Sequence, residues 1–185
     1  MPGHELLGIC VVYLGGLNYF FAVDEKSPVV SKIGTPVGEL HVQITPCTLA
    51  HSCAVQRDQD DKDDDGFVPY ERTELDSSEE QVYEYMDRTL QYRVRIIAIQ
   101  NLTRTRKFSH VFVRYTFFKA GATQTERQVI KMQQQHGGGG DGVGLGCVGF
   151  QHERRFAVDV NDALVKYMAS NNLTLEVFGC NSNSD

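Results

Sequence analysis

The chain is short of basic residues. Its 185 residues include 18 Lys and Arg against 24 Asp and Glu, which gives a formal net charge of −6 and a pI near 5.5. Nucleic-acid binding draws its affinity from clustered Lys and Arg, so this balance argues against a nucleic-acid partner.

Motifs that hold nucleotides or build active sites are also missing. The sequence has no GxxxxGK[ST] motif to cradle a triphosphate, which argues against an ATPase in this chain. The stretch from Gly144 to Gly149 matches GxGxxG, but glycines precede it and a predicted strand follows it. A dinucleotide site needs the reverse, a strand before the glycines and a helix after them. Since Ser, Cys and His also lack a recognisable nucleophile setting, we expect no enzymatic activity and no cofactor.

Cysteines are few, and their spacing shows no paired motif. The five are Cys10, Cys47, Cys53, Cys147 and Cys180, and no two of them form a CxxC motif. An odd count is unsuited to a secreted disulfide framework, so we expect reduced thiols in an intracellular chain. Cys47, His51 and Cys53 lie close together, but a structural zinc site needs four ligands and no second pair follows at ligand spacing. We predict no zinc site.

One long uncharged run, from Leu6 to Val23, approaches the length of a membrane span. It lacks a preceding Lys or Arg, and Gly15, Gly16 and Asn18 interrupt it. We therefore predict a buried strand, turn and strand here in place of a membrane or signal segment.

Alternation of apolar and polar residues indicates β-strands along most of the chain. The stretch from Pro28 to Ile44 predicts a hairpin turning at Gly34 to Pro36, with Leu40, Val42 and Ile44 on one face. Further strands are predicted at 92–96, 110–118, 126–131, 156–160 and 173–177. Asn161 stands where the N-cap of one short helix is expected, with Leu164, Val165 and Met168 on its apolar face. The pattern predicts an all-β fold, an antiparallel β-sandwich over residues 6–182 with one minor helix.

Two insertions interrupt this domain. Residues from about 50 to 86 are acidic and poor in apolar side chains, and we expect them to be disordered. Residues 136–149 are rich in glycine and are predicted to form a flexible loop. Within the acidic insertion, Asp61, Asp63 and Asp65 occupy positions 1, 3 and 5 of an EF-hand-like loop, with Gly66 at position 6. Arg72 stands where the bidentate Glu belongs, so we favour a solvated acidic loop over this calcium candidate.

A basic cluster is the one charge feature with a binding role. Arg104, Arg106 and Lys107, with Arg114 nearby, give the loop after the first strand beyond the insertion a basic tip. Such a tip can bind anionic lipid headgroups or an acidic partner. The alternative is that these residues are polar only because the loop is exposed to solvent.

Several stretches of the sequence resemble the C2-like domain in the tail of kinesin-3 microtubule motors. The resemblance is carried by Gly149–His152, Ala157–Val160, Asn161–Tyr167 and Leu173–Gly179 near the end, and by Val12–Leu14, Leu17, Tyr19, Val30–Gly34 and Gly38–Val42 near the beginning, followed by Tyr92–Arg95. It thus covers most of the chain outside residues 50–85.

The resemblance implies a C2-like sandwich from a vesicle-transporting motor, placed beyond the motor and forkhead-associated domains. Its expected role is cargo-adaptor attachment or motor regulation, in the cytoplasm and on the cytoskeleton, with microtubules reached only through the motor domain. Where calcium-binding relatives of the fold carry aspartates, this chain has Thr103 to His110, which disfavours calcium-triggered docking. The alternatives are an anionic membrane binder that uses the basic cluster and a calcium binder built on the acidic loop.

Overall fold

The computed structural model describes residues 4–47, 82–103, 107–132 and 145–181. The strands are β1 (His4–Tyr13), β2 (Val23–Val30), β3 (Pro36–Cys47), β4 (Thr89–Leu102), β5 (His110–Tyr115), β6 (Thr123–Gln124), β7 (Gln128–Val129), β8 (Lys131–Met132), β9 (Gly146–Asp159) and β10 (Asn172–Cys180). The helical elements are the 3-10 helices η1 (Gly15–Tyr19) and η2 (Val82–Tyr85) and the α-helix α1 (Asp162–Ser170).

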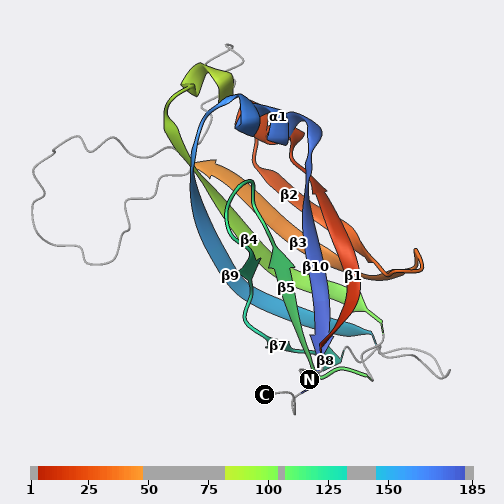
Figure 1. The fold of residues 1–185 in the computed structure, drawn as a ribbon. Coiled ribbons are helices and arrows are strands. Elements are labelled where there is room, and N and C mark those ends of the chain that lie inside the picture. The colour runs from red at the N-terminus through yellow and green to blue at the C-terminus, as the bar shows by residue number, and fades with distance from the viewer. Residues whose placement is uncertain (1–3, 48–81, 104–106, 133–144, 182–185) are drawn as a thin grey trace, which may run out of the picture.

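These strands form an antiparallel sheet that curls around a core (Figure 1). The hydrogen-bonded order is β6, β5, β10, β1, β2, β3, β4, β9 and β8, and β7 pairs with β5. Across the core, Tyr115 of β5 packs on Phe156 of β9 with ring centroids 6.2 Å apart, and Phe117 packs on Tyr92 of β4 at 5.7 Å. The predicted all-β, sandwich-like fold with one minor helix is confirmed.

The curled sheet has two layers that meet at two seams. Among the described residues, the register between β1 and β2 consists of the single pair Ile9 with Val30, which makes this junction the β1–β2 seam. At the other seam the chain runs from β7, which pairs with β5, directly into β8, which pairs with β9. One layer therefore holds β5, β10 and β1, and the other holds β2, β3, β4 and β9.

The predicted period-two burial is found in the central strands. Leu40, Val42 and Ile44 of β3 are buried, whereas His41 and Gln43 between them are half-buried. On β4 and β10, every second residue likewise enters the core: Tyr92, Val94, Ile96, Leu173, Leu175 and Val177. Burial of these side chains supplies the main stabilisation of the sandwich.

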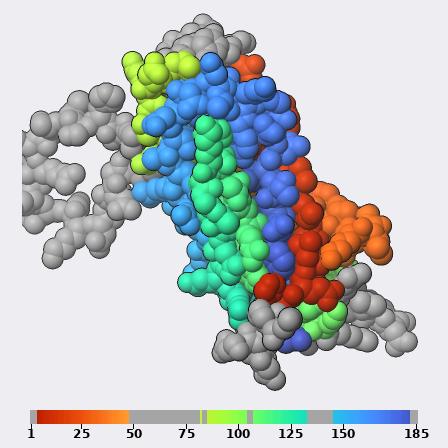
Figure 2. Space-filling view, viewed as in Figure 1, coloured from red at the N-terminus to blue at the C-terminus, as the bar shows by residue number. Residues whose placement is uncertain are grey.

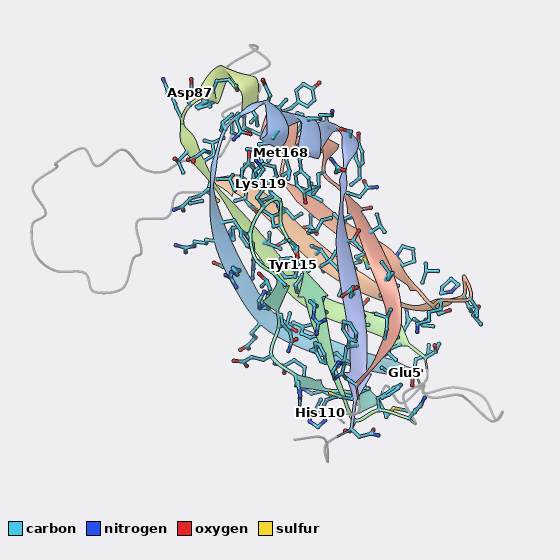
Figure 3. The ribbon with its side chains drawn as sticks, in the orientation of Figure 1. Glu5, Asp87, His110, Tyr115, Lys119 and Met168 are labelled. Carbon is cyan, nitrogen blue, oxygen red and sulfur yellow. The ribbon has the colours of Figure 1, made fainter. Side chains whose placement is uncertain are left out.

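The helix α1 closes one end of the sandwich. Its N-cap is Asn161, whose side-chain oxygen accepts a hydrogen bond from the Leu164 backbone N–H at 3.1 Å, as the sequence predicted. Leu164 and Met168 are buried, and Tyr92 Oη donates to Met168 Sδ at 3.7 Å from the sheet below (Figure 3). Asn18 of η1 reaches the Val165 carbonyl at 3.5 Å, which joins η1 to this cap.

The acidic insertion ends earlier than the predicted boundary near residue 86. Val82 of η2 is 1 % exposed and belongs to the core, and the Tyr85 ring meets Phe20 edge-on at 5.1 Å. The predicted insertion included these two apolar residues because the sequence around them is acidic. Residues 48–81 lie outside the described ranges, and so do the calcium candidates Asp61, Asp63 and Asp65.

Strand β9 begins ten residues before the predicted strand at Phe156, inside the predicted glycine-rich loop. Gly146 pairs with Leu102 and Gly149 with Ala98, across two irregularities in the β4 ladder. Glycine is tolerated where a strand bulges or bends, so a glycine-rich sequence does not exclude a strand. The predicted loop is therefore wrong from Gly146 onward. Residues 133–144 lie outside the described ranges. The predicted strand at 126–131 is divided between β7 and β8, and the one at 110–118 ends at Tyr115.

The uncharged run from Leu6 to Val23 forms most of β1, then η1, then the first residue of β2. In the part of the chain that the structure describes, no helix has the length and apolar character needed to cross a bilayer. The predicted first strand and the turn are confirmed, but the second strand begins only at Val23, the last residue of the run. Burial of the whole run is not confirmed, because several of its large side chains face outward.

Candidate functional site

The outer face of β1 carries an apolar stripe. Ile9, Val11 and Tyr13 are 39 %, 48 % and 62 % exposed, and these three residues are called the β1 stripe below. Leu7 and Val12 lie on the opposite, core-facing side, with the phase shifted by an irregularity between Leu6 and Gly8. The solvent side of an antiparallel sheet is ordinarily polar, so a contiguous apolar stripe there marks a surface suited to contact with another molecule.

A polar groove lies on the far side of the neighbouring strand β10. Thr174 of β10 stands opposite Val11, and Glu176 stands opposite Ile9. The groove has a volume of about 320 Å³ and is lined by Arg114, Tyr115, Thr116, Tyr167, Asn172, Thr174 and Glu176. Figure 2 shows β1 in red at the surface beside β10 in blue, with β5 in green beyond it. The stripe and the groove therefore share one face of the first layer.

Arg114, a residue predicted to bind partners, is held in this face. It stands opposite Glu176 in the register of β5 with β10, and its guanidinium lies 4.8 Å from the centroid of the Phe178 ring. Phe178 in turn stacks on Phe112 at 5.1 Å, and His4 meets both rings edge-on. A guanidinium packed on an aromatic face keeps its charge in a fixed position, so Arg114 offers a fixed cation beside the groove.

The predicted basic tip is described only in part. Arg104 and Arg106 lie outside the described residues. Lys107 forms an ion pair with Glu5 of β1, and its ammonium lies 5.3 Å from the centroid of the Phe108 ring. Glu5 and His110 mark this end of the sandwich, opposite Met168 of α1 (Figure 3). Lys107 is therefore engaged with the N-terminal strand, whereas Arg114 lies on the outer face of β5.

The turn between β2 and β3 lies at the same end. Thr103 donates its backbone N–H to the Val37 carbonyl at 2.8 Å, which ties the loop after β4 to the base of this turn. Ile33 in the turn is 79 % exposed, beside the exposed Lys32, and Gly34 supplies the positive φ of 81° that closes the turn. This arrangement places an apolar side chain and a cation together at a protruding tip.

A second groove, of about 420 Å³, lies along β9 at the other seam. Its lining residues are Thr125, Glu126, Gln128, Phe150, Gln151, His152 and Glu153. Tyr115 Oη and His152 Nε2 are 3.0 Å apart, and burial is the main cause that lowers the pKa of the imidazole. Glu153 contacts Arg95 and Arg155, each at 3.6 Å. Two of the lining side chains, those of His152 and Glu153, are thus engaged in structural contacts.

Three of the described thiols, those of Cys10, Cys47 and Cys180, are buried, and burial raises the pKa of each. Burial raises the pKa of Cys10 to about 12 and that of Cys47 to about 11. Cys47 Sγ donates to the Thr45 carbonyl at 3.2 Å, while His51 and Cys53 lie outside the described residues. Within the described ranges, no group of three or more His, Cys, Asp or Glu side chains gathers where it could hold a metal ion.

Comparison with protein-family models and with curated proteins found no match for this chain. The β1 stripe and its neighbouring groove are therefore the observations on which the function rests. The run from Leu6 to Leu14 is apolar in both phases of the strand period. A strand with one buried face needs only one apolar phase, so the second apolar phase is the sequence signal for the stripe.

Proposed function

We propose that this chain is a non-catalytic interaction module of a kinesin-3-like microtubule motor that carries vesicles. Its partner is a cargo adaptor or another segment of the same motor. The observation that carries the interaction role is the β1 stripe, an apolar surface displayed on a rigid sheet. Interfaces place such apolar residues at their centre and polar groups around them, which is the arrangement of the stripe beside Arg114 and Glu176.

The motor context is supported by the resemblance alone. The residues that carry it fall within β1 and η1, the hairpin of β2 and β3, and β4, β9, α1 and β10. A test is to sequence full-length transcripts that contain this reading frame. A P-loop motor sequence on the same transcript would support the proposal, whereas complete transcripts without one would leave a freestanding adaptor and remove the motor part.

The interaction role has its own test. Purified chain is titrated with the remaining segments of the parent motor and with its adaptors, and the affinity is measured by isothermal calorimetry. We expect Arg114→Glu to weaken an authentic partner at least ten-fold, because this substitution reverses the fixed charge beside the groove. Lys119→Glu is the matched control, since Lys119 is an exposed cation outside the groove lining. Equal affinities of both variants for every partner would contradict the assignment of this face.

A second candidate function, binding to anionic membranes, is favoured by Ile33. An exposed apolar side chain next to Lys32 is the combination that enters a headgroup region. Co-sedimentation with phosphatidylserine vesicles, with and without calcium, tests it, with Ile33→Asp compared against wild type. Loss of vesicle binding in the variant would establish the membrane function, and calcium-dependent binding would point to the acidic loop instead.

A further inference from the structure

Two side chains on the outer face of the first layer are held in place by the residues beneath them. The Tyr13 ring lies so close to Gly15 of η1 that a Cβ atom at position 15 would stand 2.4 Å from a ring carbon. The Arg114 guanidinium lies on the Phe178 ring. Tyr and Arg are among the residues that most often dominate the binding energy of protein interfaces. Because these two are already ordered, a partner that contacts them loses less side-chain entropy on binding.

The strand register gives the distance between these two side chains. Tyr13 of β1 stands opposite Asn172 of β10. Arg114 of β5 stands opposite Glu176, four residues further along β10. Four residues of a strand span about 13 Å, and two strand spacings span about 10 Å. The Tyr13 and Arg114 Cα atoms are therefore about 16 Å apart, diagonally across the face.

The face between them offers side chains and no free strand edge. β10 lies between β1 and β5, and each of these has a further strand on its other side. An extended peptide laid on this face would have no strand with which to pair its backbone N–H and C=O groups. An α-helix satisfies most of its own backbone groups, and about eleven helical residues span 16 Å. The geometry of the face therefore suits a helix of three turns.

The shape of the face also favours a helix over a second sheet. Sheets stack through apolar side chains contributed by several strands. Among the described residues, the exposed large apolar side chains of β1, β5 and β10 all belong to β1. Exposed Thr174, opposite Val11, lines the groove of about 320 Å³ midway between the rows of Tyr13 and Arg114. A groove with one apolar side and one polar side matches the two sides of an amphipathic helix.

The chemistry at the Arg114 end favours a single carboxylate. Among the described residues, no Asp or Glu forms an ion pair with Arg114. A carboxylate matches the planar donor pair of a guanidinium. Glu176 stands on the adjacent strand, and its charge would oppose a phosphate group, which carries nearly two negative charges. Glu or Asp is therefore the expected residue of the partner at this position.

We propose that this face docks an amphipathic α-helix of a partner protein. Apolar side chains of the helix cover the β1 stripe, and a Glu or Asp about three turns away pairs with Arg114. This inference rests on the proposed function, because it names the kind of partner that the same face takes.

Selection from peptide libraries tests the helix. Two phage-displayed libraries of about 18 residues, long enough to be helical in isolation, are selected against the immobilised chain. One has an alanine-rich helical scaffold and the other is fully random. We expect the scaffolded library to give the tighter binders, with apolar residues at helical spacing and Glu or Asp about three turns away. Enrichment without helical spacing, enrichment from the random library alone, or no enrichment from either library would overturn the proposal.

Charge exchange tests the contact with Arg114. The Kd of an enriched acidic peptide is measured by fluorescence anisotropy for wild type, for Arg114→Glu and for the control Lys119→Glu. We expect Arg114→Glu alone to bind roughly ten-fold more weakly, and to recover when the carboxylate of the peptide is replaced by Arg. Equal effects of the two variants, or no recovery, would show that the helix does not contact Arg114 and would overturn the proposal.

The stripe is tested with the same peptide. Val11→Lys places a charge on the stripe and should weaken binding roughly ten-fold. Ala157→Lys, its matched control, adds the same charge at an exposed position of β9 in the other layer and should bind like wild type. Gly15→Ala displaces the Tyr13 ring without adding charge and should have a smaller effect than Val11→Lys. Equal binding by Val11→Lys and Ala157→Lys would contradict the placement of the helix on β1.

The helix and the proposed function fail separately. An authentic partner that needs Arg114 but binds through an extended segment or a sheet would contradict only the helix. Helical peptides that bind this face, while the parent motor and its adaptors bind Arg114→Glu as tightly as wild type, would contradict only the proposed function.

Discussion

Strands β1 and β2 border the same seam but differ in chemistry. The outward residues of β1 beyond Ile9 are Val11 and Tyr13, both apolar and exposed. Those of β2 are Asp24, Lys26 and Pro28, which are also exposed. The outer face of β2 is therefore polar, whereas that of β1 is apolar. The difference indicates that the outer face of β2 is suited to contact with water and that of β1 to contact with another molecule.

The outer face of the second layer continues the polar character of β2. Asp24 Oδ1 lies 2.6 Å from His41 Nε2, and Gln43 Nε2 donates to Asp24 Oδ2 at 2.7 Å. Arg95 of β4 extends this network by donating to Gln43 Oε1 at 3.3 Å. Solvated hydrogen-bonded side chains of this kind add little to stability but disfavour apolar contacts.

The largest expected effect is on the unfolding free energy, and it distinguishes the buried face of β1 from its exposed face. Val12→Asp introduces an unpaired charge at a fully buried position and should cost about 3 to 5 kcal/mol of unfolding free energy. Val11→Asp, one residue away on the outer face, should stay within about 0.5 kcal/mol of wild type. Urea denaturation followed by circular dichroism measures both. Similar losses for the two variants would mean that the assigned strand phase is wrong.

Making the outer face of β2 apolar should bring its behaviour closer to that of β1. The double variant Lys26→Val, Pro28→Val replaces two exposed residues of β2 with apolar side chains. We expect concentration-dependent association, read by light scattering, because the chain then exposes apolar side chains on two strands. Lys166→Val on α1, also exposed, controls for the loss of one charge. Unchanged scattering of the double variant would show that apolar side chains on this face do not promote association.

The seam at β9 depends on a hydrogen bond that is sensitive to pH. Tyr115→Phe removes the partner of His152 and should cost about 1 kcal/mol. Burial and Arg154 lower the pKa of His152 from 6.5, with Glu126 opposing them. The unfolded chain therefore binds a proton more readily, and stability should fall as pH drops through 6.5. Denaturation midpoints between pH 8 and 5 should vary less in His152→Gln, and an unchanged slope would contradict this assignment.

The smallest expected effect on stability is that of removing the Asp24 carboxylate on β2. Hydrogen bonds from Gln43 and His41 lower the pKa of Asp24, so its contribution is present above pH 3.8 and is lost as pH falls through the folded-state pKa. Because the carboxylate is exposed, Asp24→Asn should change stability by less than about 0.5 kcal/mol at pH 7. Thermal melts at pH 7 and pH 3 check this, and a large loss at pH 7 would show that the network has a structural role.

Much of the fold followed from local patterns. Alternation placed the core side of β3, β4 and β10, and Asn161 marked the start of α1, because both signals involve residues close in sequence. Composition was a poorer guide. Val82 in an acidic stretch and Gly146 in a glycine-rich one both belong to ordered elements, since packing partners far along the chain decide such cases.

For the candidate site, the sequence indicated Arg114 but not its surroundings. The aromatic ring beneath its guanidinium comes from β10, more than sixty residues later, and only the β5–β10 register brings the two together. Lys107, expected beside Arg114 at one basic tip, is paired instead with Glu5 from the N-terminal strand. Such pairings depend on strand order, which periodicity does not encode.

The sequence by itself determined that this chain forms antiparallel strands with a short capped helix, because burial alternates with the strand period. Only the tertiary structure decided which side of β1 faces water. The run from Leu6 to Leu14 is apolar in both phases, so either face could have been buried. The irregularity between Leu6 and Gly8 and the pairing of β1 with β10 set that phase, with Cys10 and Val12 in the core and Val11 and Tyr13 outward.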